Sequence, residues 1–279
     1  NPYATSDGPS VVRSRIKELG VDAVIAIGGD DTLGAAARLA QDGLSIIGIP
    51  KTVDNDLTHT YYTPGFPSAA YYLASFTNEI KRDAAYALSR VYIIEAMGFK
   101  AGWLTCAGAL GGADIVLPPE WKISWKHTLG LLSKRYQENG NFAVVVVSQE
   151  AHFDEEISGL PDQQIGEGHG HTRHSFICLT LRDKIRAELG IDAKPLYPGN
   201  YVETGAPIPF DRDFAIALGQ KAVQLLHAGT SAFQIEGEMT VTIGEIANLA
   251  TALAVIVGVV FGILQLQHMA QTRAILASA

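Results

Sequence analysis

The sequence predicts an α/β protein with mostly parallel sheets, because short apolar runs alternate with longer stretches of helical character. The 279 residues, 47% of them hydrophobic, can bury a sizeable core and agree with one α/β unit of two similar lobes. Strands are expected at residues 23–27, 45–49, 91–94, 115–117 and 142–147.

Helices are expected between these strands. Residues 11–20 carry a helical pattern that ends at Gly20, and glycine suits the left-handed conformation that follows many helices. A second helix should begin near Thr32, after the first strand. Further helices near Ser68 and Ser175 should turn apolar faces toward a core.

Two polar loops, each directly after one of the first two strands, are the most informative parts of the chain. They read GGDDT at residues 28–32 and PKTVDND at residues 50–56. The carboxyl edge of a parallel sheet is where open α/β folds bind ligands. Paired glycines allow a phosphate to approach the backbone, and the amino end of the following helix attracts an anion. The two loops therefore predict a phosphate-binding site.

These loops also combine four aspartates with one lysine. Carboxylates beside a phosphate repel it unless a cation or a proton transfer is involved, so the composition indicates Mg²⁺ and phosphoryl transfer. One carboxylate would hold a metal ion that bridges the donor phosphates, and another would accept the proton of the attacking hydroxyl. The alternative for GGD alone is a solvated acidic loop, and the second loop argues against it.

In combination the two loops resemble the 6-phosphofructokinase family, and in particular its diphosphate-dependent branch. The resemblance covers about residues 1–240 and includes, in the family's order, the segments 63–66, 90–98, 101–103 and 210–212. It implies two similar three-layer α/β/α lobes. The first, at 1–66 and 203–246, would hold the phosphoryl donor, magnesium and the catalytic loop, and the second, at 67–202, the sugar phosphate.

The resemblance also implies roles for single residues. Asp30 matches the magnesium-binding aspartate, Asp54 the base that deprotonates the sugar's C1 hydroxyl, and Thr52 a hydroxyl that stabilises the transition state. Asp56 matches a supporting carboxylate, and Arg90 an arginine that reaches the sugar phosphate across a subunit interface, which implies a homo-oligomer. The residues implied in donor binding are Gly29, Asp30, Asp31, Thr32 and Lys51. Those implied in substrate binding are Thr52, Asp54, Arg90, Met97, Gly98, Glu150 and Lys194.

The implied reaction transfers phosphate from diphosphate, or from ATP, to the C1 hydroxyl of fructose 6-phosphate and gives fructose 1,6-bisphosphate in glycolysis. Asp31 and Lys51 favour diphosphate, because ATP-using members resemble GGDG at the first loop. An aspartate there adds bulk and negative charge where the nucleotide's α-phosphate would lie, whereas lysine supplies a charge for a small polyanion.

Departures from the family pattern keep a second hypothesis open, a non-catalytic or membrane-attached relative. Phe99 and Glu203 stand where the family has arginines, and a carboxylate repels phosphate. The sugar-binding glutamate falls at Gln149 or Glu150, and Glu150 is preferred. The family's opening strand, glycine turn and first crossover are unmatched, which predicts an amino-terminally truncated chain. An enzyme similar to the NAD or lipid kinases is a narrower alternative, against which PKTVDND argues.

The carboxyl-terminal segment 247–279 predicts an apolar helical tail that does not resemble the family. Residues 246–267 contain no charged residue and are long enough to span a bilayer, and Gly258 and Gly262 have a spacing that lets membrane helices approach closely. A buried or oligomer-forming helix is the alternative. The expected location is cytoplasmic, and the uncharged run favours a membrane anchor.

Composition excludes other classes of function. A net charge of −8 and the absence of a Lys/Arg run argue against nucleic acid as a partner. Cys106 and Cys178 lack CxxC spacing and are interpreted as buried thiols in a reducing compartment. Three histidines within 166–174 suggest a metal site, but their glycine neighbours and uneven spacing favour a loop.

Overall fold

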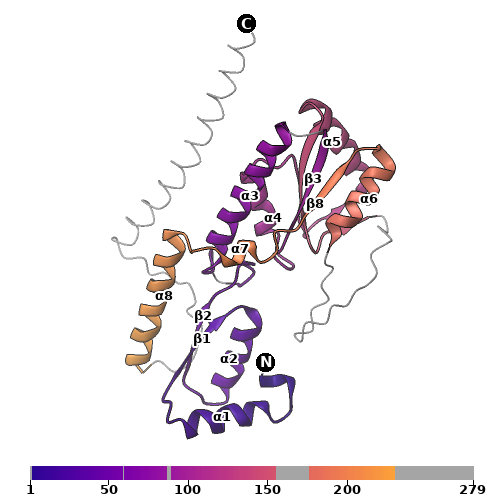
Figure 1. The fold of residues 1–279 in the computed structure, drawn as a ribbon. Helices are drawn as coiled ribbons and strands as arrows, with labels where there is room; N and C mark the ends of the chain where they lie inside the picture. Colours follow the sequence, from indigo (N-terminus) through magenta and orange to yellow (C-terminus); the bar gives the residue numbers. More distant parts are fainter. Residues whose placement is uncertain (1, 59, 87–88, 155–175, 230–279) are drawn as a thin grey trace. The chain divides into compact units, whose positions relative to one another are not determined.

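The computed structural model describes residues 2–58, 60–86, 89–154 and 176–229, and these residues form an α/β fold with parallel sheets (Figure 1). The elements in chain order are η1 (Pro2–Ala4), α1 (Gly8–Glu18), β1 (Val24–Gly28), α2 (Asp30–Gln41), β2 (Ile46–Pro50), α3 (Phe66–Tyr86), β3 (Arg90–Ala96), α4 (Trp103–Leu110), β4 (Ile115–Leu117), β5 (Lys122–Ile123), α5 (Trp125–Glu138), β6 (Phe142–Ser148), β7 (His152–Phe153), α6 (Ile177–Leu189), β8 (Ala193–Leu196), α7 (Tyr201–Thr204) and α8 (Pro209–His227).

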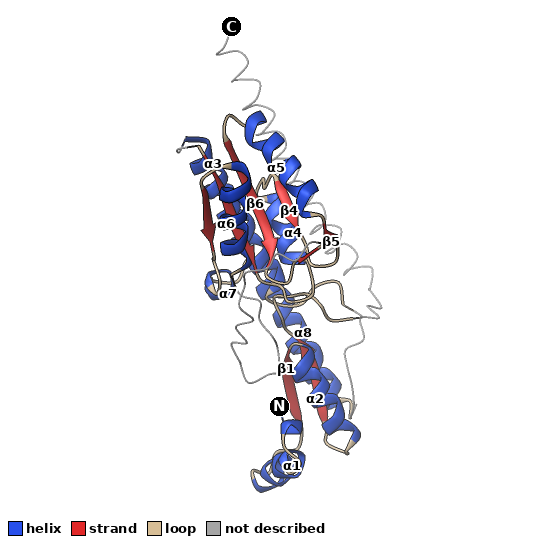
Figure 2. Cartoon of the chain, turned by 90° about the vertical axis from the view of Figure 1, so that its right-hand side faces the viewer, coloured by secondary structure: helices blue, strands red, loops and turns tan. Residues whose placement is uncertain are grey.

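The larger sheet has the strand order β4-β6-β3-β8 and is parallel throughout. Alternate residues of the inner strand β3 pack in different cores, because successive side chains of a strand point to opposite faces of the sheet. Val91 and Ile93 pack in a cluster with residues of α5 and α6, whereas Tyr92 and Ile94 pack in another with residues of α3 and α4. Helices therefore cover both faces of this sheet, which makes it the middle of three layers (Figure 2).

The smaller sheet pairs β1 with β2 in parallel, with Val24 opposite Ile46 and Gly28 opposite Pro50. Ile46 packs with Ala36 and Leu39 of α2. On the other face, Ile47 and Ile49 pack with Ala222 of α8, so the chain returns to its first sheet after completing the second. Two helices thus enclose this strand pair from opposite faces.

The α/β class with mostly parallel sheets is confirmed, and all five expected strands are present. The helix expected from the pattern at residues 11–20 is α1. Its expected end is confirmed, since Gly20 adopts the left-handed conformation, with a φ of 63°, just after the helix. The helix expected near Thr32 begins at Asp30, because Gly29 already occupies the cap position. Strands β5, β7 and β8 had no counterpart among the expected elements.

Other expectations are corrected or fall outside the described residues. Cys178 is buried, but Cys106 is exposed because it lies on the face of α4 that points away from the sheet. No helix within the described ranges is long and apolar enough to cross a membrane. The expected tail at 247–279, its uncharged run at 246–267 and the histidine-containing stretch 166–174 lie outside those ranges.

Candidate active site

The two sequence loops meet at the carboxyl edge of the smaller sheet. Strands β1 and β2 end opposite each other, and the Lys51 amide donates a hydrogen bond of 2.9 Å to the Gly28 carbonyl. A Cβ atom built on Gly29 would lie 3.5 Å from the Cβ of Thr52. The turn after β1 and the loop after β2 are therefore so close that a side chain at Gly29 would touch Thr52.

The turn after β1 leaves the amino end of α2 open to an anion. Gly29 caps this helix and has no side chain with which to occupy the first amide groups. A Cβ atom at Gly28 would approach the Thr32 hydroxyl oxygen to 2.6 Å, so only glycine fits beneath that side chain. Asp30 and Asp31 occupy the first helical turn, where the helix dipole favours negative charge.

The loop after β2 is held by hydrogen bonds from Thr63. Asn55 is buried and adopts a φ of 55°, and its side-chain oxygen accepts a 2.9 Å hydrogen bond from the Thr63 amide. The Thr63 hydroxyl donates to the Thr52 carbonyl at 2.7 Å, and the Asp54 amide donates to the Thr52 hydroxyl oxygen at 3.1 Å. The backbone around Asp54 is thereby fixed from both sides.

The carboxyl group of Asp54 has an unusual proton affinity. Burial, followed by the negative charges of Asp56 and Glu203, raises its pKa from 3.8 to about 6. A hydrogen bond from the Thr52 side chain and the Lys51 ammonium act in the opposite direction, with smaller effects. A carboxylate that exchanges its proton near neutral pH is suited to general base catalysis.

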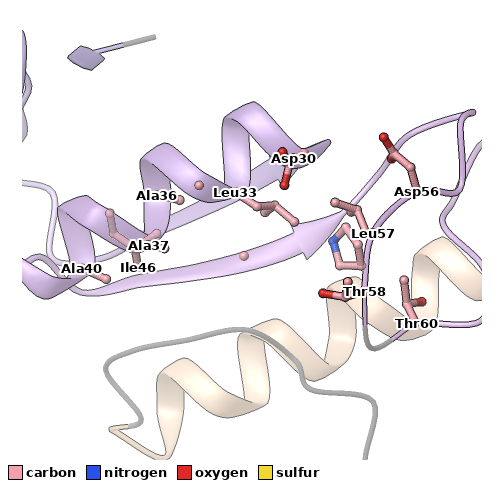
Figure 3. Close-up of a pocket in the computed structure, with 13 residues that line it drawn as sticks. Asp30, Leu33, Ala36, Ala37, Ala40, Ile46, Asp56, Leu57, Thr58 and Thr60 are labelled. Carbon is pink, nitrogen blue, oxygen red and sulfur yellow. The ribbon is translucent and has the colours of Figure 1, made fainter. Parts of the chain in front are cut away.

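Asp30 and Asp56 both line a cavity of about 290 Å³ between α2, β2 and the loop that follows the second motif (Figure 3). Its far end is apolar, with Ala36, Ala40 and Ile46. Within the described ranges, no three His, Cys, Asp or Glu residues gather as a metal-binding group. Asp30 alone fits Mg²⁺, which usually binds through one or two carboxylates together with substrate phosphates and water.

The acceptor-side residues of the second lobe lie at the carboxyl edge of the larger sheet. Met97 and Gly98 directly follow β3, and Glu150 follows β6 closely, since Ala96 is opposite Ser148. The Gln149 amide donates to the Ala96 carbonyl at 2.9 Å, which ties the two strand ends together. Val53 and Met97 pack against one hydrophobic cluster, which brings the catalytic loop to this edge.

Arg90 and Lys194 lie away from this edge. Arg90 is the first residue of the seven-residue strand β3, so about 20 Å of strand separates it from Met97. Its guanidinium group lies 3.7 Å from the Asp192 carboxylate, and its Nε is buried without a hydrogen-bond partner. Lys194 is opposite Tyr92, also toward the amino end. A single chain does not bring either cation to Met97.

The two departures in sequence lie on the acceptor side after β3 and in α7, and of these Glu203 acts on the catalytic loop. Phe99 follows the acceptor turn with a φ of 50°, and the Lys100 ammonium lies 5.3 Å from the centre of its ring. Glu203 belongs to α7, whose Val202 is buried in the same cluster that Val53 packs against. This shared packing brings the Glu203 charge within electrostatic reach of the catalytic loop.

Several residues of the site were given no role from the sequence, although Thr63, Trp103 and Asp211 fall in segments that resemble the family. Lys100 and Trp103 line a second cavity of about 520 Å³ that also contains Asp56. Thr63 and Asp211 act through hydrogen bonds to residues distant in the chain. Only the position of Thr63 next to a proline and a glycine could have pointed to a constrained turn.

A match to the Phosphofructokinase family spans residues 1–226. The chain belongs to the phosphofructokinase family. It is 36% identical over 236 residues to a pyrophosphate–fructose 6-phosphate 1-phosphotransferase of Dictyoglomus thermophilum, with 83% of this chain and 67% of the relative covered. It is 33% identical to an ATP-dependent 6-phosphofructokinase of Streptomyces coelicolor over 90% of this chain and 73% of that relative.

The fold of a solved phosphofructokinase agrees with that of this chain. The pyrophosphate-dependent phosphofructokinase of Marinobacter aquaeolei matches with a TM-score of 0.70 at 24% identity. The match covers 82% of this chain and 57% of the Marinobacter chain. The chain therefore spans somewhat more than half of the length of the solved protein.

Proposed function

We propose that this protein is a diphosphate-dependent 6-phosphofructokinase that transfers a phosphoryl group to the C1 hydroxyl of fructose 6-phosphate. The observation that carries the proposal is the meeting of the two loops, which brings Thr52 against the glycine turn that precedes Asp30. Asp54 lies two residues further along, with its pKa raised to about 6. The arrangement joins an open helix amino terminus for a phosphate to a base for a hydroxyl proton.

In this proposal each residue acts at a defined atom. The Asp54 carboxylate removes the proton from the sugar hydroxyl as it attacks the donor, and Asp56 supports its orientation. The Thr52 hydroxyl, which donates to the Asp54 carboxylate in the free protein, would turn its one proton to the oxygens of the transferring group. Asp30 would hold Mg²⁺, which when bound supplies positive charge to the donor phosphates. Gly29 and Thr32 leave room for those phosphates at the start of α2.

The donor preference is argued from Asp31 and Lys51. Asp31 lies in the first turn of α2, where its carboxylate would repel an additional phosphate of a nucleotide. Lys51 is exposed directly after β2 and can place its ammonium beside a compact polyanion. Diphosphate is therefore the proposed donor, and ATP is the alternative.

The location of Arg90 and Lys194 supports a shared site in a homo-oligomer. Both side chains start near the amino end of the larger sheet, far from Met97 of the same chain. They can bind the sugar phosphate only in the site of a second subunit. The division into two lobes is supported by the packing of α8 on β2 and of the helices α3 to α6 on the larger sheet.

The donor assignment is tested by measuring fructose 1,6-bisphosphate formation from fructose 6-phosphate and Mg²⁺. Diphosphate is supplied in one reaction and ATP in the other. Product with diphosphate alone is the expected result, and product with ATP alone would refute the donor argument. Chelation of Mg²⁺ should abolish turnover, and restoration of the metal should recover it.

A second candidate function, a non-catalytic phosphofructokinase-like protein, is favoured by Glu203. Its negative charge acts on Asp54 and would repel an acceptor phosphate. The Glu203→Arg variant separates the candidates. A large gain in turnover would show that the wild-type chain is an enzyme limited on the acceptor side, whereas two inactive proteins that both bind diphosphate would support the non-catalytic function.

A further inference from the structure

Asp211 is a buried carboxylate that is far from both sequence loops along the chain. It lies in the first turn of α8, and the residue is only 3% exposed. Its oxygens accept hydrogen bonds from the Gly65 amide at 2.8 and 3.0 Å, from the Ser68 amide at 3.3 Å and from the Ser68 hydroxyl at 2.6 Å. The Ser68 hydroxyl oxygen in turn accepts from the Ile208 amide at 3.1 Å.

These contacts join α8 to the catalytic loop through two steps. Gly65 forms a parallel bridge with Thr52, and it adopts a φ of 105° that only glycine tolerates readily. Thr52 then accepts the hydrogen bond of the Asp54 amide at 3.1 Å. Because one buried side chain accepts all of these hydrogen bonds, they restrict the movement of Gly65 and, through the bridge, of Thr52.

We infer that Asp211 is a positioning residue, which acts through Gly65 to hold Thr52 and Asp54 in the geometry needed for proton and phosphoryl transfer. The inference rests on the proposed function for its consequence in catalysis. The link between Asp211 and Gly65 can be tested without turnover, because it consists of hydrogen bonds between two residues 146 positions apart in the chain. Small displacements of catalytic groups reduce rates strongly, by up to about 100-fold for 1 Å.

The Asp211→Asn variant is the primary test. An amide has one acceptor oxygen in place of two and turns a donor toward the amides of Gly65 and Ser68. We expect kcat to fall by about 10- to 100-fold while the KM for fructose 6-phosphate changes by less than about threefold. Asp213→Asn is the matched control, because Asp213 lies on the same helix turn but is exposed and contacts Arg212.

The pH profile distinguishes positioning from general destabilisation. Asp56 and Glu203 raise the pKa of Asp54, and Thr52 and Lys51 lower it. If Thr52 is displaced, Asp54 loses a hydrogen bond that lowers its pKa, whereas the charges of Asp56, Glu203 and Lys51 remain. The acid limb of kcat/KM should therefore move to higher pH in Asp211→Asn and stay in place in Asp213→Asn. A loss of thermal stability with an unmoved limb and unchanged kcat would overturn the inference.

Two further measurements keep the test decisive. Ser68→Ala removes the 2.6 Å contact but leaves Gly65 bound, so it should shift the limb in the same direction by a smaller amount if Asp211→Asn does not fold. An NMR titration of the Asp54 carboxyl group reports the same displacement without turnover. A wild-type chain that is inactive with both donors would refute the proposed function, whereas an Asp54 titration unchanged by either variant would refute the role of Asp211.

Discussion

Replacing Asp54 by asparagine should stabilise the protein at neutral pH while removing its proposed base. The folded protein holds the Asp54 proton up to about pH 6, whereas the ordinary value for the carboxyl group is 3.8. Between these two pH values the folded state binds more protons than the unfolded state, so its stability falls as the pH rises. Above about pH 6 the full cost of ionising this buried group is present.

The magnitude follows from the size of the displacement. A pKa raised from 3.8 to about 6 corresponds to about 3 kcal/mol of destabilisation at pH 8. About half of that cost is present at pH 5, and little remains at pH 4. Asparagine cannot ionise, so Asp54→Asn should be more stable than the wild type by about 3 kcal/mol at pH 8, or about 6–12 °C in Tm.

The assay is denaturant or thermal unfolding of both proteins between pH 4 and pH 8, with Asp213→Asn as an exposed control. The difference between Asp54→Asn and the wild type should grow with pH and level off above about pH 6. The variant should also lose product formation. A pH-independent difference, or a variant less stable than the wild type at pH 8, would refute the argument that burial and neighbouring charge raise the pKa of Asp54.

Three further predictions concern charge and packing. Glu203→Gln removes one cause of the raised Asp54 pKa, so the acid limb of kcat/KM should move to lower pH, and a limb that moves upward would contradict this. Asp31→Gly should raise kcat/KM for ATP relative to diphosphate by about tenfold, if the removed repulsion is about 1.4 kcal/mol; paired donor assays check this. Gly108→Ala should destabilise the protein by about 1–3 kcal/mol, because its Cβ would lie 2.6 Å from a β6 side chain. Gly130→Ala is the matched control, since nothing lies within 4 Å of that Cβ, and it should stabilise α5 by about 0.5–1 kcal/mol in the same unfolding measurement.

Local patterns in the sequence were sufficient for the strands β1, β2, β3, β4 and β6 and for the two loops. Apolar runs such as 142–147 are recognisable because a strand buried on both faces admits few polar residues. Strand β8 could not be recognised, since the residues Ala193–Leu196 include a lysine and a proline and are partly exposed. It is a strand because β3 offers an unpaired edge, which is a property of the assembled sheet.

The candidate site divides in the same way. The residue types and order of GGDDT and PKTVDND, with the strands before them, predicted a phosphoryl-transfer site at a sheet edge, because that chemistry depends on contiguous residues. Only the tertiary structure showed that Glu203 acts on Asp54, that Arg90 lies at the opposite end of β3 from Met97, and that Asp211 supports Gly65. Burial, electrostatic fields and hydrogen bonds between residues more than a hundred positions apart depend on how helices and strands pack. A linear sequence does not contain those distances.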